Sequence, residues 1–279
     1  MSANVRVALD VMGGDHAPGE MVLGAVQAAR EYGLGVYLVG QEDLITVELT
    51  KHEIQGLDLP IVHTSEIIPM DEHDPARAAR NKNTSMVRAL QLVKDGAARG
   101  AVSAGNSGAM MAASLFTLKR LEGVERPALG GIFPTKDGVC LVIDIGANTD
   151  CKPEYLQQFA VMGSIYMQRL FHVSTPRVAL LANGEEEGKG NEQVQLAHQL
   201  LKQSATTLGL HFIGNVEGRD IPAGNADVVV CDGFVGNVVL KLSEGLAETL
   251  IDLIKGQIAS DLLGKLAGAV IRPRLRKVM

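Results

Sequence analysis

Eight short apolar runs alternate with segments of helical periodicity, and this alternation limits the possible folds more than any other feature of the chain. The runs cover residues 5–11, 35–40, 59–63, 100–105, 139–146, 177–184, 210–216 and 226–233. Because they are almost continuously apolar, they predict strands buried on both faces of a parallel sheet, with helices as crossovers. The sequence therefore predicts a three-layer α/β/α fold with a doubly wound, mostly parallel sheet.

Two runs lie too close together for a helical crossover. Only residues 134–138 separate the run at 128–133 from the run at 139–146, so we expect an antiparallel hairpin there. No Ser- or Pro-rich linker marks a domain boundary. We therefore expect one α/β/α domain over residues 1–255 and a helical, amphipathic appendage over residues 256–279.

Composition excludes several classes of protein. The 279 residues are 46% hydrophobic, which excludes disorder as a main theme, and the net charge of -6 argues against a nucleic-acid binder. Cys140, Cys151 and Cys231 form no CxxC pair, and Cys140 and Cys231 lie in apolar runs, which indicates buried thiols in a reducing cytoplasm. No secretion signal or membrane span is predicted. Residues 256–279 carry a net charge of +4 and the remainder carries -10, so the basic surface is local.

Small and polar residues follow five of the predicted strands, at the edge where open parallel sheets bind ligands. Each alone is explained by a tight turn or a helix N-cap, but a shared sheet edge favours a site. Glycines and helix N-termini there favour an anion. The residues are Asp10, Gly13 and Gly14, then Gly105, Asn106, Ser107 and Gly108, then Asn148, then Asn183, Gly188, Lys189 and Gly190, and finally Asp232, Gly233 and Asn237.

Lys189 stands between two glycines and behind three glutamates, in the segment NGEEEGKGNEQV. The spacing does not match a nucleotide P-loop. We expect the next helix to begin near Gly190 or Asn191, so that the glutamates turn outward while Lys189 faces the ligand, or one glutamate orients Lys189. Lys82 is a second candidate cation, before a helix that Thr84 or Ser85 would cap, although a solvated charge cluster explains it equally well.

Asn237 lies one turn into a predicted helix. Its apolar stripe of Val235, Val238, Val239, Leu242 and Leu246 is expected to face the core, which makes Asn237 a ligand-facing donor. Neither the GxSxG turn of a hydrolase serine nor a GxGxxG dinucleotide motif is present. The sequence therefore predicts no covalent serine and no nicotinamide cofactor.

Five segments together resemble one known family. ALDVMGGDHAP, AVSAGNSGA, LVIDIGAN, LLANGEEEGKG and DVVVCDGFVGNVVLK are similar to segments of the bacterial phosphate acyltransferases of phospholipid synthesis. The resemblance implies a homodimer, related in fold to phosphate acetyltransferases and to the isocitrate-dehydrogenase group. It also implies transfer of a fatty acyl group from acyl carrier protein to inorganic phosphate, and the product is acyl phosphate for a membrane glycerol-3-phosphate acyltransferase.

The resemblance also implies roles for the candidate residues. Phosphate is itself the nucleophile, so positioning and electrostatics suffice, and we expect no metal and no cofactor. Lys189 and helix-start amides would hold phosphate, and Asn148, Asn183 and Asn237 would donate to the thioester oxyanion. Asp232 would orient Lys189 or accept a proton from phosphate. The alternatives are a phosphate acetyl- or butyryltransferase that uses coenzyme A thioesters, a decarboxylating dehydrogenase, and a non-catalytic partner that recruits others to membranes.

The basic end contains an apolar helical pattern. Leu262, Leu266 and Val270 recur every fourth residue, and Arg274, Arg276 and Lys277 follow. This pattern fits an ordinary dimer or core helix, or a peripheral contact with an anionic membrane and with a membrane-bound acyltransferase there. Because acyl phosphate is consumed at the bilayer, we favour the membrane contact.

Overall fold

The computed structural model describes residues 5–258 and groups the chain into two compact units, of which the first ends at Gly123 and the second begins at Val124. The sequence, which has no Ser- or Pro-rich linker, predicts one domain over residues 1–255. The predicted membrane residues Leu262, Leu266, Val270, Arg274, Arg276 and Lys277 lie outside the described residues. The two units are described separately below.

Unit 1 contains a parallel four-stranded sheet in the order β3-β2-β1-β4. Its elements are β1 (Arg6–Asp10), α1 (Gly19–Tyr32), β2 (Gly35–Gly40), α2 (Glu42–Leu49), β3 (Ile61–His63), α3 (Pro75–Ala78), α4 (Ser85–Lys94), β4 (Ala101–Ser103) and α5 (Ser107–Thr117).

Alternate strand residues bury opposite faces of this sheet. Leu9 and Leu38 pack with α1 and α2, whereas Ala8 and Val39 pack with Ala89 of α4. This period of two places helices on both faces. Unit 1 therefore has three layers, as predicted.

Unit 2 contains a mixed five-stranded sheet in the order β5-β6-β9-β7-β8. Its elements are β5 (Gly130–Thr135), β6 (Gly138–Ile143), α6 (Pro153–Leu170), β7 (Arg177–Leu181), α7 (Glu192–Leu208), β8 (His211–Val216), α8 (Asp220–Ala223), β9 (Val228–Val230) and α9 (Gly233–Ile258). β5 and β6 pair antiparallel and the other pairs are parallel, which confirms the predicted hairpin.

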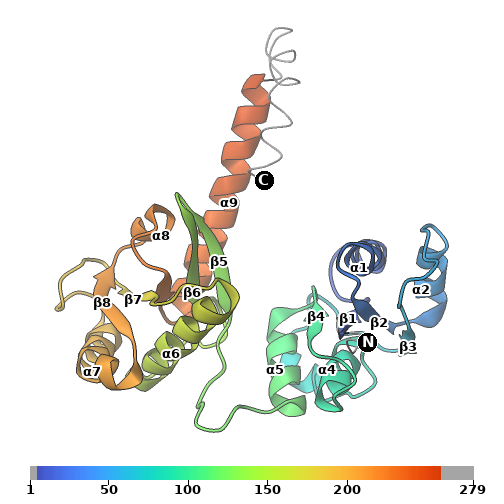
Figure 1. Ribbon diagram of the computed structural model, residues 1–279, viewed down its shortest axis with the longest axis horizontal. Helices are drawn as coiled ribbons and strands as arrows, with labels where there is room; N and C mark the ends of the chain where they lie inside the picture. Colours follow the sequence, from blue (N-terminus) through green and yellow to red (C-terminus); the bar gives the residue numbers. More distant parts are fainter. Residues whose placement is uncertain (1–4, 259–279) are drawn as a thin grey trace. The chain divides into compact units, whose positions relative to one another are not determined.

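The same alternation covers both faces of the second sheet. Leu141 and Leu180 pack with Phe159 of α6 and Leu201 of α7, and on the other face Ala179 and Val229 pack with α8 and the first turns of α9. Figure 1 shows α6 and α7 on one side of this sheet, and α9 extending away from it. The predicted α/β/α class is confirmed, but the five strand ends lie on two sheets rather than on one.

Candidate functional site

In unit 1, Asp10 links the loops that follow β1 and β4. Asp10 is buried and accepts a 2.7 Å hydrogen bond from the Ser103 hydroxyl, whose oxygen accepts a 3.1 Å bond from the amide of Gly105. A methyl group at Gly13 would lie 2.7 Å from Oδ2 of Asp10 and 2.9 Å from the amide nitrogen of Gly105. Asp10 and Gly13 therefore hold two neighbouring strand ends together, while Gly14 supplies the positive φ of 109° in the same loop.

Asn106 begins α5, with Ser107 and Gly108 in its first turn. Its side-chain oxygen accepts a 2.9 Å bond from the amide of Ala109, and its Nδ2 donates to the backbone oxygen of Met70. Asn106 is thus an N-cap that also ties down a neighbouring loop.

Lys82 lies elsewhere in unit 1. It is exposed and lines a pocket along α4, with Arg88 and Lys94. Thr84 occupies the predicted N-cap position, but its hydroxyl donates to the backbone oxygen of Asn81 instead of capping α4.

In unit 2, Asp144 organises the loop after β6. Its buried carboxylate accepts backbone hydrogen bonds from Leu129, Gly146, Ala147 and Asn148, and one from the Asn148 side chain. The Asn148 Nδ2 group also donates to the backbone oxygen of Pro127. Both of its donor bonds are therefore used within the fold, so Asn148 shapes the loop and has no side-chain donor left for an oxyanion.

The start of α9 packs directly against this loop. The amide of Gly233 donates a 2.7 Å bond to the backbone oxygen of Asn148, and a methyl group there would lie 2.8 Å from the Asn148 nitrogen. A methyl group at Gly236 would overlap the backbone oxygen of Asp144. These two glycines are therefore needed for close backbone packing, a reason that does not depend on a ligand.

An open pocket of about 450 Å³ lies at the carboxyl ends of the neighbouring strands β7 and β9. Asn183, Gly190, Cys231 and Asp232 line it, together with the start of α7. Asp232 is buried, and its Oδ1 accepts a 2.8 Å bond from the amide of Val235 in α9, whereas its Oδ2 has no hydrogen-bond partner among the described residues. Asp232 thus caps α9 with one oxygen and keeps the other for a ligand or a proton.

Asn183 reaches across the loop that carries Lys189. Its Oδ1 accepts a 2.8 Å bond from the amide of Gly190, which turns its Nδ2 group away from this contact. That Nδ2 group makes no hydrogen bond within residues 5–258, so it remains a neutral donor. The next helix begins at Glu192 with Asn191 as the N-cap, which confirms the predicted start.

Two of the three glutamates before Lys189 are paired with other cations. Glu187 pairs with Lys202, and Glu185 lies 3.9 Å from Arg219. Lys189 is exposed, and it forms no ion pair with any glutamate or with Asp232 in the described part of the chain. Its stem lies over Gly184, where a methyl group would meet Cγ of Lys189 at 2.7 Å. Glu185 and Glu187 therefore do not neutralise Lys189, whereas Oε2 of Glu186 would lie 2.9 Å from the same methyl group at Gly184, beside the Lys189 stem.

Two buried residues that the sequence analysis missed support this loop. His198 of α7 and Asn215 of β8 are 4% and 5% exposed, and Nδ1 of His198 lies 2.9 Å from Oδ1 of Asn215. Asn215 donates from Nδ2 to the backbone oxygen of Glu186, so its Oδ1 accepts and His198 carries its proton on Nδ1. Periodicity identifies such positions only as core, because their partners are 17 and 29 residues away.

Asn237 is exposed in the first turns of α9 and lies over the glycine of the β6 loop. Its side-chain Oδ1 would be 3.7 Å from a methyl group at Gly146. The stripe predicted around it is only partly correct. Val235 and Val239 pack on the core, but Val238, Leu242 and Leu246 are 52%, 67% and 54% exposed. α9 extends past the sheet, and within residues 124–258 nothing covers these three residues.

None of the three thiols has a lowered pKa. Burial raises the pKa of Cys140 to about 12 and that of Cys151 to about 11, and burial also raises the pKa of Cys231. Thiols with such pKa values remain protonated near neutral pH and are poor nucleophiles. Cys231, although it lines the pocket, is not poised for covalent catalysis.

Comparison with known proteins assigns the chain to a family. A family described as "Fatty acid synthesis protein" matches residues 5–279. The chain is 53% identical over 270 residues to a phosphate acyltransferase of Geobacter sulfurreducens. The matched region covers 96% of this chain and 76% of that protein. It is 48% identical over 272 residues to a phosphate acyltransferase of Pelotomaculum thermopropionicum, covering 98% and 78%.

Solved structures show the same fold. A phosphotransacetylase from Staphylococcus aureus matches 88% of this chain and 83% of its own, with a TM-score of 0.62 at 20% identity. A branched-chain phosphotransacylase from Enterococcus faecalis matches 84% of this chain and 83% of its own, with a TM-score of 0.53 at 16% identity. Within residues 5–258, no helix has the length and apolar character needed to cross a bilayer.

Proposed function

The chain belongs to the phosphate acyltransferases of the fatty acid synthesis protein family, and from that premise we propose that it transfers a fatty acyl group from acyl carrier protein to inorganic phosphate. The observation that carries this proposal is the loop 183–191 of unit 2. Among residues 5–258, Lys189 of this loop has no ion-pair partner, and it lies beside glycines and an asparagine donor that makes no hydrogen bond there. Such a loop attracts an anion and leaves its charge able to react.

The reaction needs no enzyme nucleophile. An oxygen of monohydrogen phosphate attacks the thioester carbonyl carbon, a C–O bond forms, and the C–S bond breaks. The proton of the phosphate passes to the departing sulfur, which leaves acyl phosphate and the free thiol of the carrier. Catalysis then depends on holding phosphate against the carbonyl and on stabilising the negative charge that develops on its oxygen.

The residues of unit 2 suit these two tasks and the transfer of the proton. Lys189 and the amides of the first turn of α7 would hold phosphate, since a cation and the positive end of a helix dipole lie near each other there. Asn183 and Asn237 would donate to the oxyanion, because both are exposed and the Asn183 Nδ2 group is unpaired in the described chain. The Oδ2 of Asp232, which has no hydrogen-bond partner in the described part of the chain, would accept the phosphate proton and pass it to sulfur.

We also propose that a second copy of the chain covers α9. Phe234, Val238, Leu242, Leu246 and Leu250 recur every fourth residue along one face, and each is about half exposed or more. An apolar stripe of this length is costly in water and matches its own symmetry mate in an isologous interface. A shift from dimer to monomer in Leu242→Glu, measured by light scattering, would support a homodimer, and an unchanged mass would contradict it.

The cellular setting follows from the product. Acyl phosphate is amphiphilic, so a cytoplasmic enzyme that touches an anionic membrane shortens its path to a membrane glycerol-3-phosphate acyltransferase. The basic pattern of residues 256–279 supports such peripheral contact. Co-sedimentation with anionic vesicles at low salt tests it, and full recovery of the protein in the supernatant would argue against it.

The central test is the donor and the product. The purified chain is incubated with phosphate and palmitoyl carrier protein, and acyl phosphate is trapped as a hydroxamate while free thiol is counted. Equal yields of both are expected. Turnover of acetyl- or butyryl-coenzyme A without turnover of palmitoyl carrier protein would instead favour a short-chain phosphate acyltransferase. No turnover with any thioester would contradict the proposal.

A further inference from the structure

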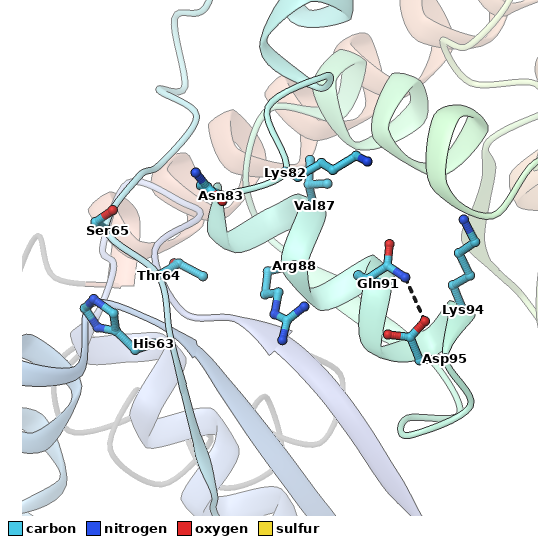
Figure 2. Close-up of a pocket in the computed structure, with 10 residues that line it drawn as sticks. All are labelled: His63, Thr64, Ser65, Lys82, Asn83, Val87, Arg88, Gln91, Lys94 and Asp95. Carbon is cyan, nitrogen blue, oxygen red and sulfur yellow. Dashed lines mark hydrogen bonds between the residues drawn. The ribbon is translucent and has the colours of Figure 1, made fainter.

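Unit 1 contains a basic pocket of about 720 Å³ beside α4. Asp10 and the two loops that it links do not line this pocket. We call it the α4 pocket. Figure 2 shows the residues that line it: His63, Thr64 and Ser65 at the end of β3, Lys82 and Asn83 before α4, and Val87, Arg88, Gln91, Lys94 and Asp95 along α4 and at its end.

The cations of this pocket are unneutralised. Lys82, Arg88 and Lys94 are exposed, and none of them makes an ion pair with another residue of the described chain. Asp95 is the pocket's one carboxylate, and it accepts a 2.7 Å hydrogen bond from the side chain of Gln91. The pocket is therefore positive, although the whole protein carries a net charge of -6.

Neutral donors accompany the cations. Nδ1 of His63 accepts a hydrogen bond from the amide of Glu42, which leaves Nε2 as the donor side of a neutral ring. Thr64 is 6% exposed, and its hydroxyl has no hydrogen-bond partner in the described residues. This hydroxyl oxygen is covered from solvent, so the groups that a partner can reach are the exposed cations and the Nε2 group of His63.

The spacing of the cations argues for an extended partner. Arg88 and Lys94 are six residues apart on one helix, which separates their Cα atoms by about 9 Å along the axis. Lys82 lies before the helix begins. Figure 2 shows the side chains of Arg88 and Lys94 pointing in different directions, so these two cations do not meet at one small ion, whereas a protein surface with several carboxylates can contact both. The pocket is also open and mostly polar, which fits a transient, electrostatically guided contact.

We propose that the α4 pocket docks the acidic surface of the carrier protein that delivers the thioester. This inference rests on the proposed function, because it takes the donor to be a carrier protein rather than a small coenzyme. It adds a recognition surface in unit 1 to the reaction residues of unit 2. The carrier must present carboxylates at the contact, and the association must weaken as salt rises.

The test measures binding apart from turnover. Labelled acyl carrier protein is titrated with the full chain, and Kd is read from fluorescence anisotropy at low and high salt. The double variant Arg88→Glu/Lys94→Glu should raise Kd by roughly tenfold or more at low salt and flatten its salt dependence. The matched control is Lys136→Glu/Arg169→Glu, which reverses two exposed cations of unit 2 and should leave Kd unchanged.

A charge swap makes the test specific. Carrier variants with single Glu→Lys changes should bind the Arg88→Glu/Lys94→Glu enzyme better than wild-type carrier does, which a merely unfolded variant could not reproduce. The KM for phosphate should stay the same in this enzyme variant. An unchanged Kd would overturn the docking site, whether or not the KM for phosphate rises, and would leave the proposed function standing. If wild-type enzyme binds no carrier and uses only coenzyme A thioesters, the proposed donor is wrong and the docking site fails with it.

Discussion

Asn215 donates a 2.9 Å hydrogen bond from its side chain to the backbone oxygen of Glu186, and so joins β8 to the loop that ends at Lys189. Buried His198 completes the contact from α7. Two buried residues of unit 2 therefore support the loop of the candidate site. Its position depends on packing in unit 2 rather than on the loop sequence alone.

Asn215→Ala should loosen this loop. The change leaves the Glu186 carbonyl and the His198 ring without a partner, which costs about 1–3 kcal/mol of stability. We expect faster hydrogen exchange of the amides in residues 184–190 and a lower kcat. Gln157→Ala is the control, because it removes a 2.7 Å side-chain bond between α6 and α7 away from the loop. Equal exchange rates in the two variants would show that Asn215 does not position the loop.

Lys189→Ala should impair the use of phosphate without unfolding the protein. Lys189 is exposed and makes no ion pair in the described chain, so the fold does not depend on its charge. Loss of one charge-assisted contact to an anion should raise the activation free energy by about 1.5–3 kcal/mol. The kcat/KM for phosphate should then fall on the order of ten- to a hundredfold. Lys136→Ala, in the β5-β6 turn, should have no effect. Wild-type kcat/KM in the Lys189 variant would remove this residue from the site.

Asn237→Asp should reduce activity more than Asn237→Ala does. Both variants lose the amide donor, but the aspartate also places a negative charge over Gly146 at the strand edge, where it would repel phosphate. Steady-state rates of the two variants, measured at low and high salt, check this order. If the aspartate variant is as active as wild type, Asn237 is only a helix residue.

Two glycines of α9 should respond in opposite ways to alanine. A methyl group at Gly236 would overlap the Asp144 backbone, so Gly236→Ala should destabilise unit 2 by about 1–3 kcal/mol or more. Gly245 is exposed, with nothing within 4 Å of an added methyl group, so Gly245→Ala should stabilise the helix by roughly 0.5–1 kcal/mol. Urea unfolding measures both changes. Similar midpoints would contradict the close packing of α9 on the β6 loop.

Alkylation should leave the native enzyme active. Burial raises the pKa of Cys140 to about 12 and of Cys151 to about 11, and it also raises that of Cys231, so the thiolate forms appear only as pH rises far above neutral. Treatment with iodoacetamide at neutral pH should therefore preserve turnover, while the denatured chain should label all three cysteines. Rapid loss of activity with labelling of Cys231 would contradict its burial.

Local structure and the chemical character of the loops could be predicted from the sequence alone. Runs of Val, Ile and Leu with helical segments between them predicted the strands and the α/β/α layers, and the five-residue gap at 134–138 predicted the β5-β6 hairpin. The segment GNEQV predicted a helix start near Gly190 or Asn191, and α7 begins at Glu192 with Asn191 as its N-cap. These predictions are correct because helix and strand periods, turns and caps depend on neighbours within a few residues.

Which of these parts come into contact depends on the tertiary structure. It divided the strand ends between two sheets, used both donors of Asn148 inside its loop, and left Leu242 and Leu246 of α9 outside the core. It also placed His198 and Asn215 beneath the Lys189 loop. Each outcome depends on contacts between residues distant in the chain, such as the 87 positions that separate Asp144 from Cys231. Local periodicity shows that a side chain will be covered, but which group covers it is set by the packing of the whole chain.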